Sequence, residues 1–155
     1  MAAGSVGGDD LVTVVFLVGL LAVLVSVSVV DLRERRIPNR LTYPTMFVCI
    51  ALVITGAPAT PALVGAAVFS TTLLVPHLLR PDAMGFGDVK LALILGFAIG
   101  WVAAGWSEAV VAVGWTVALS SAVGLVGAAV WRRRSIPFGP ALSIGSTITI
   151  VATLA

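Results

Sequence analysis

Residues 25–44 read VSVSVVDLRERRIPNRLTYP and place an aspartate, Asp31, directly at the end of a long apolar run. Arginines and an Ile-Pro-Asn step follow it. Positive charge beside an apolar helix has an ordinary explanation, because Lys and Arg orient helices in membranes. A carboxylate at that position has no such explanation, since it costs free energy unless it is paired, hydrated or functional. Asp31 is therefore a candidate functional residue.

The composition of the whole chain indicates that lipid, and not water, surrounds most of it. Of 155 residues, 59% are hydrophobic and only 10% are charged, with a mean hydropathy of +1.14. A soluble domain has about 25% charged residues, which it needs to cover its surface. The first ten residues lack the basic segment of a secretory signal peptide, so the first apolar run is expected to remain as a membrane helix.

Six apolar segments, separated by breaks rich in Gly, Pro or charge, predict an all-α fold. We expect a polytopic bundle of six transmembrane helices forming a single integral-membrane domain over residues 1–155. Gly96 and Gly100 form a GxxxG spacing, which is typical of closely packed membrane helices. The predicted helices cover approximately residues 11–30, 41–56, 61–79, 89–105, 109–131 and 138–155.

The charged residues predict the orientation of this bundle. All nine basic residues fall in or beside the first, third and fifth loops, whereas Asp9, Asp10 and Glu108 lie on the other side. Because positive loops stay in the cytoplasm, we expect a plasma-membrane protein with both termini outside. The basic excess is thus a topology signal, and no nucleic-acid partner is expected. The basic residues are Arg33, Arg35, Arg36, Arg40, Arg80, Lys90, Arg132, Arg133 and Arg134.

A second carboxylate, Asp88, lies at the start of the fourth segment in MGFGDVK, residues 84–90. Two spans separate it from Asp31, so both residues return to the cytoplasmic side. Two carboxylates that share one water repel each other, which raises one pKa and lowers the other. Such a pair suits an aspartyl protease, in which the ionised acid activates water and the protonated acid polarises the scissile carbonyl. The pair titrates as a unit, so neither role is assigned individually.

The residues next to both aspartates predict that the backbone around them is shaped as a functional site. Gly85 and Gly87 permit positive φ and close approach of the backbone. Asp88 opens a helix, whose partial positive charge favours the ionised form. Pro38 interrupts a continuous helix, and Asn39 is expected to cap the next one. The alternative is that both aspartates merely end helices beside arginines.

Three motifs together resemble those of the type IV prepilin peptidases, which are GxGD-type intramembrane aspartyl proteases. DLRERRIPNRLT (31–42) and GFGDVKL (85–91) resemble the two active-site motifs, and IPFGPALSIG (136–145) resembles the stretch that opens the last helix. The resemblance covers most of the chain. It implies cleavage of prepilin or pilin-like precursors at the cytoplasmic membrane face, after a short basic leader.

The same resemblance implies roles for individual residues. Asp31 and Asp88 become the catalytic dyad, and the supporting residues of the motifs are Pro38, Asn39, Gly85 and Gly87. Bifunctional members carry a cytoplasmic insertion with paired cysteines that methylates the new N-terminus. This chain has one cysteine, Cys49, and a short first inner loop. A peptidase-only form of the kind serving Flp-type or archaeal-type filaments is therefore expected, without metal or cofactor.

Other functions remain as alternatives. A zinc protease needs two histidines, but His77 is the only one, and no GxSG context supports a rhomboid-like serine enzyme. Presenilin-like and signal-peptide-peptidase-like enzymes share GxGD but lack the Asp-x5-Ile-Pro-Asn element. A small transporter would place relay carboxylates near the bilayer midplane. A structural assembly subunit would tolerate loss of both aspartates. The oligomeric state and the particular substrate stay open.

Overall fold

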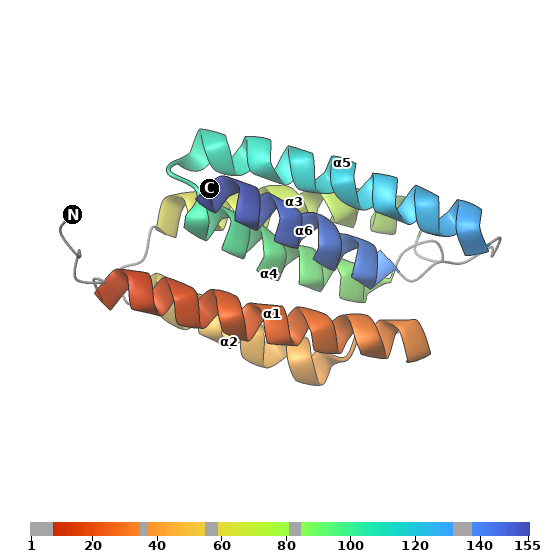
Figure 1. Cartoon of the computed structure of the whole chain (residues 1–155), viewed down its shortest axis with the longest axis horizontal. Helices are drawn as coiled ribbons and strands as arrows, with labels where there is room; N and C mark the ends of the chain where they lie inside the picture. The colour runs from red at the N-terminus through yellow and green to blue at the C-terminus, as the bar shows by residue number, and fades with distance from the viewer. Residues whose placement is uncertain (1–7, 35–36, 55–58, 81–84, 132–137) are drawn as a thin grey trace.

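All regular structure in the described part of the chain is helical, which confirms the predicted all-α class. The computed structural model describes residues 8–34, 37–54, 59–80, 85–131 and 138–155, and these contain no strand. Several basic residues used for the orientation lie outside the described residues: Arg35, Arg36 and Arg132 to Arg134. The helices are α1 (Gly8–Glu34), α2 (Asn39–Ile54), α3 (Ala59–Leu79), α4 (Phe86–Val102), α5 (Trp106–Trp131) and α6 (Phe138–Leu154) (Figure 1).

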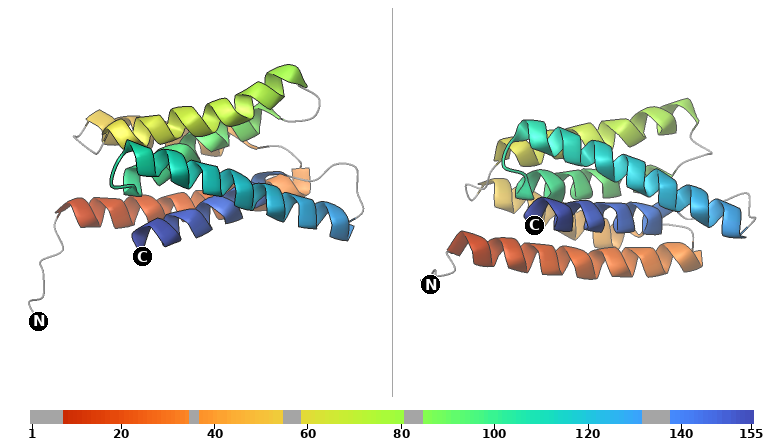
Figure 2. Two further views of the ribbon diagram at one scale, coloured as in Figure 1. Left: turned by 90° about the horizontal axis from the view of Figure 1, so that it is seen from above. Right: turned by 45° about the horizontal axis from the view of Figure 1, so that its top comes forward.

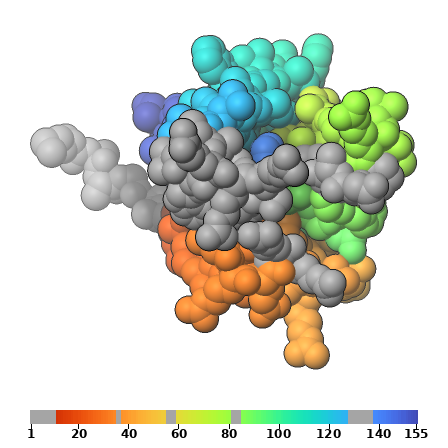
Figure 3. All heavy atoms as spheres, turned by 90° about the vertical axis from the view of Figure 1, so that its right-hand side faces the viewer, coloured from red at the N-terminus to blue at the C-terminus, as the bar shows by residue number. Residues whose placement is uncertain are grey.

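Successive helices run in opposite directions along one bundle (Figures 1 and 2). The ends of α1, α3 and α5 therefore lie on the same side as the beginnings of α2, α4 and α6, whereas the beginning of α1 and the end of α6 lie on the other side. Asp31 is in the last turn of α1 and Asp88 in the first turn of α4. We call this side the aspartate end; Figure 3 views the molecule from it, with α1 and α2 below and α5 above.

Helix α4 forms the centre of the bundle. It packs against α2, α3, α5 and α6, and its residues are buried almost continuously from Leu91 to Trp101. A helix that is apolar on all faces is stable only where other helices or lipid surround it. The burial of α4 fixes the position of its first turn, and therefore of Asp88.

The interface between α3 and α4 depends on glycines. A Cβ added to Gly65 would collide with the carbonyl oxygen of Gly96, and one added to Gly100 would collide with that of Pro61. The two backbones therefore touch directly, which confirms the close packing predicted from the GxxxG spacing. Such contacts are typical of membrane helices, where small residues let backbones approach.

The length of the helices supports a membrane protein but not every predicted crossing. Three of the described helices are long and apolar enough to cross a membrane: Leu11–Glu34, Ala59–Leu79 and Trp106–Gly127. The other three have 16 or 17 residues, or roughly 25 Å of helix against a hydrocarbon layer of about 30 Å. Crossing by α2, α4 and α6 thus stays a prediction.

Substituting Gly96→Ala should destabilise the bundle, because its Cβ would lie 2.8 Å from the Gly65 carbonyl carbon and 2.9 Å from the Phe69 Cβ. Overpacking of this kind costs about 1–3 kcal/mol. The measurement is the thermal unfolding midpoint of the purified protein in detergent. Gly19→Ala is the control, since nothing lies within 4 Å of its added Cβ. Equal midpoints for the two variants would contradict this description of the α3–α4 interface.

Candidate active site

Asp31 connects the first helix to the last. Its side chain is buried, at 5% exposure, and its Oδ2 accepts a hydrogen bond of 3.0 Å from the backbone N–H of Gly139. Gly139 is in the first turn of α6, where backbone N–H groups have no partner within the helix. The carboxylate of Asp31 thus satisfies one of these donors, and the partial positive charge at the start of α6 faces it.

Glycine is required at position 139 by this contact. A Cβ there would lie 2.7 Å from Oδ2 of Asp31 and 3.2 Å from its Cγ. Real Cβ atoms do not approach other atoms so closely, so any side chain would push the carboxylate away from the N–H group. Gly139 belongs to the third motif, and this close approach gives its glycine a physical role.

Asp88 lies half-buried in the first turn of α4, close to the glycine that precedes the helix. Its backbone N–H donates to the Gly85 carbonyl at 3.1 Å, and a Cβ on Gly85 would lie 3.6 Å from Oδ2 of Asp88. Gly85 is extended, with φ −72° and ψ 143°, and Gly87 does not have positive φ either. The predicted use of positive φ is therefore wrong at both glycines, and the predicted close approach is found at Gly87, where an added Cβ would lie 2.8 Å from the Cβ of Ile37.

The two aspartate motifs touch each other through Ile37 and Gly87. A Cβ on Gly87 would lie 2.8 Å from the Cβ of Ile37. Pro38 restricts the residue before it to extended conformations, and Ile37 is accordingly outside both α1 and α2. The segment after α1 therefore passes against the backbone of α4 one residue before Asp88. Gly87 permits this contact because it has no side chain.

A second link between the motifs is made by Lys90. Its Nζ donates to Oδ1 of Asn39 at 3.0 Å and to the Tyr43 hydroxyl at 3.1 Å, and it lies 4.7 Å from the centre of the Tyr43 ring. The predicted capping role of Asn39 is wrong: Asn39 is the first residue of α2, and the carbonyl of Pro38 accepts from the N–H of Leu41 at 3.0 Å. Asn39 instead ties α2 to α4.

The electrostatics of Asp88 connect it to Asp31. Asp88 precedes the apolar segment of α4 that begins at Val89. Burial, and to a smaller extent repulsion from Asp31, raise its pKa to about 6 against the opposing effect of a hydrogen bond with the Gly85 backbone. Asp88 therefore keeps a proton up to about pH 6, where an exposed aspartate has lost it. Two carboxyl groups at one end of the bundle interact, and one holds a proton more tightly than usual.

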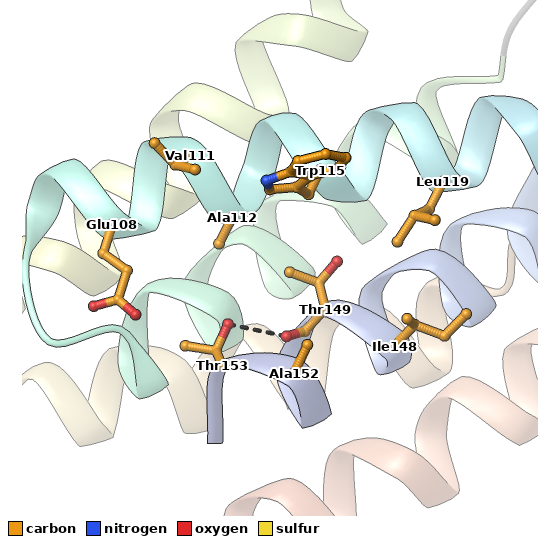
Figure 4. A pocket seen from close by; sticks show the side chains of 9 residues that line it. All are labelled: Glu108, Val111, Ala112, Trp115, Leu119, Ile148, Thr149, Ala152 and Thr153. Atoms are coloured by element: carbon orange, nitrogen blue, oxygen red, sulfur yellow. Dashed lines mark hydrogen bonds between the residues drawn. The ribbon is translucent and has the colours of Figure 1, made fainter. Parts of the chain in front are cut away.

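The groove in Figure 4 lies away from these residues. It has a volume of about 410 Å³ between α5 and α6, toward the end of the bundle where α5 begins. Glu108 lines it, but its carboxylate accepts a hydrogen bond of 2.8 Å from the Ala104 N–H and so closes the turn between α4 and α5. The lining residues are Glu108, Val111, Ala112, Trp115, Leu119, Ile148, Thr149, Ala152 and Thr153.

Sequence reasoning missed three residues that build the site. Lys90 counted only as a topology signal, Ile37 only as the residue before a proline, and Gly139 only as part of the third motif. The closeness of Lys90 to Asp88 in sequence was a weak signal. The partner of Gly139 lies 108 residues away in the chain, and no local pattern indicates it.

Comparison with known proteins identifies the family. The sequence profile of the type IV leader peptidase family matches residues 13–132. The chain belongs to this family. Both aspartates lie inside the matched range. No solved structure matches the chain.

Known proteins with similar sequences include two named prepilin leader peptidase/N-methyltransferase. The protein from Burkholderia pseudomallei is 35% identical over 144 residues, which cover 85% of this chain and 44% of that protein. The protein from Xanthomonas campestris pv. campestris is 33% identical over 139 residues, covering 81% and 45%. A type 4 prepilin-like proteins leader peptide-processing enzyme from Escherichia coli is 31% identical over 144 residues, covering 84% and 49%. The chain spans about half the length of these relatives.

The contact between Gly139 and Asp31 predicts a non-additive pair of substitutions. Gly139→Ala alone should lower the unfolding midpoint, because it removes a hydrogen bond to a charged group, worth about 1.5–3 kcal/mol. In an Asp31→Ala background the added methyl meets no carboxylate, so Gly139→Ala should cost much less. Gly114→Ala is the control, since nothing lies within 4 Å of its added Cβ. Additive effects of the two substitutions would rule out the contact.

Proposed function

We propose that this chain is an intramembrane aspartyl endopeptidase that removes the leader peptide of type IV prepilins or pilin-like precursors, with Asp31 and Asp88 as the catalytic pair. The observation that carries the proposal is the interaction of the two carboxyl groups at the aspartate end, where Asp88 has a pKa of about 6. Membership of the type IV leader peptidase family and the names of the relatives support the same activity.

The chemistry follows from a pair that holds one proton. The ionised carboxylate takes a proton from a water molecule as the water oxygen attacks the scissile carbonyl carbon. The protonated carboxyl donates to the carbonyl oxygen, which stabilises the developing oxyanion. The tetrahedral intermediate then collapses: the carboxyl that took the water proton gives it to the leaving nitrogen, the other carboxylate takes back the proton from the former carbonyl oxygen, and the peptide bond breaks. The two groups titrate as one unit, so the roles belong to the pair.

The burial of Asp88 is the feature that makes the pair suitable for acid–base catalysis. Two fully exposed carboxylates would both be ionised near neutral pH, and neither could donate a proton to the substrate. Burial together with the charge of Asp31 raises the pKa of Asp88. The pair therefore keeps its shared proton over a higher pH range than ordinary aspartates.

The charge distribution supports a cytoplasmic position for this site. Arg33, Arg40, Arg80 and Lys90 all lie at the aspartate end, and Glu108 lies at the opposite end. By the positive-inside rule the aspartate end faces the cytoplasm, so the chain is a multi-pass plasma-membrane protein that cuts near the inner surface. Both termini then lie outside.

The N-methyltransferase activity in the relatives' names is not part of the proposal. Helices α1 and α2 are separated only by residues 35–38, which leaves no room there for the cytoplasmic insertion expected in bifunctional members. Pilin-like precursors of the Flp or archaeal type are the proposed substrates. Neither a metal nor a cofactor takes part in the proposed reaction.

Substituting Asp31→Asn or Asp88→Asn should each reduce precursor cleavage by about a hundredfold or more, because each removes one half of the acid–base pair. The measurement is leader removal from a co-expressed candidate prepilin, followed by immunoblot. Glu108→Gln is the matched control, since it changes a carboxylate at the opposite end and should leave cleavage unchanged. Cleavage at the wild-type rate by either aspartate variant would exclude the pair, and a phenotype unaffected by both would favour a structural subunit.

A further inference from the structure

Two serines lie one helical turn away from the contact between Asp31 and Gly139. Ser28 precedes Asp31 by three residues on α1, and Ser143 follows Gly139 by four residues on α6. Residues at these spacings share a helix face. The hydroxyl of Ser28 donates to that of Ser143 at 3.1 Å, and the hydroxyl of Ser143 donates to the carbonyl of Gly139 at 2.9 Å. The two helices are therefore joined by polar contacts on two successive turns.

Ser28 differs in this respect from its neighbour Ser26. The hydroxyl of Ser26 donates to the carbonyl of Ala22 at 2.8 Å, four residues earlier in the same helix. This is the common way for a helical serine to satisfy its hydroxyl, and it needs no second helix. Ser28 instead directs its hydroxyl to α6. Bonds between membrane helices of this kind fix how two helices lie against each other.

Gly139 is the residue that most needs such support. Glycine has the greatest backbone freedom of all residues, and at the start of a helix it is held by few intrahelical bonds. Ser143 is buried, at 7% exposure, and its hydroxyl holds the carbonyl of Gly139. The N–H of the same residue is directed at Asp31. The bond from Ser143 to the Gly139 carbonyl helps to keep the first turn of α6 closed, and a closed first turn limits how far the Gly139 N–H can move away from Asp31.

We infer that Ser143, itself held by Ser28, is a positioning residue that orients the carboxylate of Asp31 through Gly139. The inference rests on the proposed function, because orientation matters only if Asp31 acts on a substrate. A reacting group displaced by about 1 Å can lose about a hundredfold in rate. The hydroxyls of both serines bond to groups other than the Asp31 carboxylate, and neither serine has a part in binding substrate in the proposed function, so removing either hydroxyl should affect the rate of the chemical step and not the affinity for substrate.

The test uses the full chain purified in lipid nanodiscs and a synthetic prepilin leader peptide that the wild type cleaves. Ser143→Ala and Ser28→Ala should each lower kcat roughly threefold to twentyfold, the rate equivalent of one interhelical hydrogen bond, with KM unchanged. Ser28→Ala should add nothing in the Ser143→Ala background, because the connection to Gly139 is already lost. Ser28→Thr should restore kcat, since it keeps the hydroxyl. Ser26→Ala is the matched control and should keep the wild-type kcat.

Three results would overturn the inference: wild-type kcat in both serine variants, additive effects in the double variant, or an equal loss of kcat in Ser26→Ala. Folding of Ser143→Ala is judged by size-exclusion chromatography. If this variant does not fold, the kcat values of Ser28→Ala and Ser28→Thr test the inference instead, because Ser28 is only partly buried. An Asp31→Asn variant in the same assay distinguishes a failure of the proposed function from a failure of the positioning role. If Asp31→Asn is active, the proposed function fails; if it is inactive while both serine variants behave as wild type, only the positioning role fails.

Discussion

The hydrogen bond between the Gly139 N–H and Asp31 is the constraint on which the rest of the site depends, because it joins the last turn of the first helix to the first turn of the last helix. A buried carboxylate needs partners, since an unpaired one would be costly. The start of α6 supplies a backbone donor and a partial positive charge. The same contact requires a residue without a side chain at position 139. The charge of Asp31, the backbone N–H groups at the start of α6 and the absence of a side chain at Gly139 therefore all favour the same contact.

The opposite side of the site depends on the central helix α4. Its burial by four other helices fixes the first turn, and its contacts with Ile37 and Asn39 fix the segment that follows Asp31 in the chain. Asp88 is thus held near Asp31 by the backbone contact at Gly87 and by Lys90, without a direct bond between the two acids being needed. In a membrane protein, where burial of apolar surface drives little association between helices, such close backbone contacts and polar links carry much of the packing.

The sequence alone predicts that Asp31 and Asp88 lie at the same end of the bundle, but it does not predict the contacts that hold them there. Alternating helices place every second loop at the same end, so the shared position of Asp31 and Asp88 follows from counting apolar segments. The link between Gly139 and Asp31 joins segments far apart in the chain, and helix pairing of that kind leaves no local signal. The capping role predicted for Asn39 was wrong because Lys90, from another helix, binds its side chain. Local propensity also could not decide that Gly87 of the GxGD motif serves close approach and that neither glycine of this motif has positive φ.

The central claim is that the carboxyl groups of Asp31 and Asp88 interact closely enough to share one proton, and infrared titration of 13C-labelled aspartate in nanodiscs tests it most directly. An Asp88→Asn difference spectrum identifies the band of Asp88. In the wild type this band should titrate with a pKa of about 6. Neutralising its neighbour by Asp31→Asn removes a repulsion that disfavours the ionised form, so the pKa should fall, while burial keeps it above the ordinary value of 3.8. An Asp88 pKa that is the same with and without the charge of Asp31 would contradict the account.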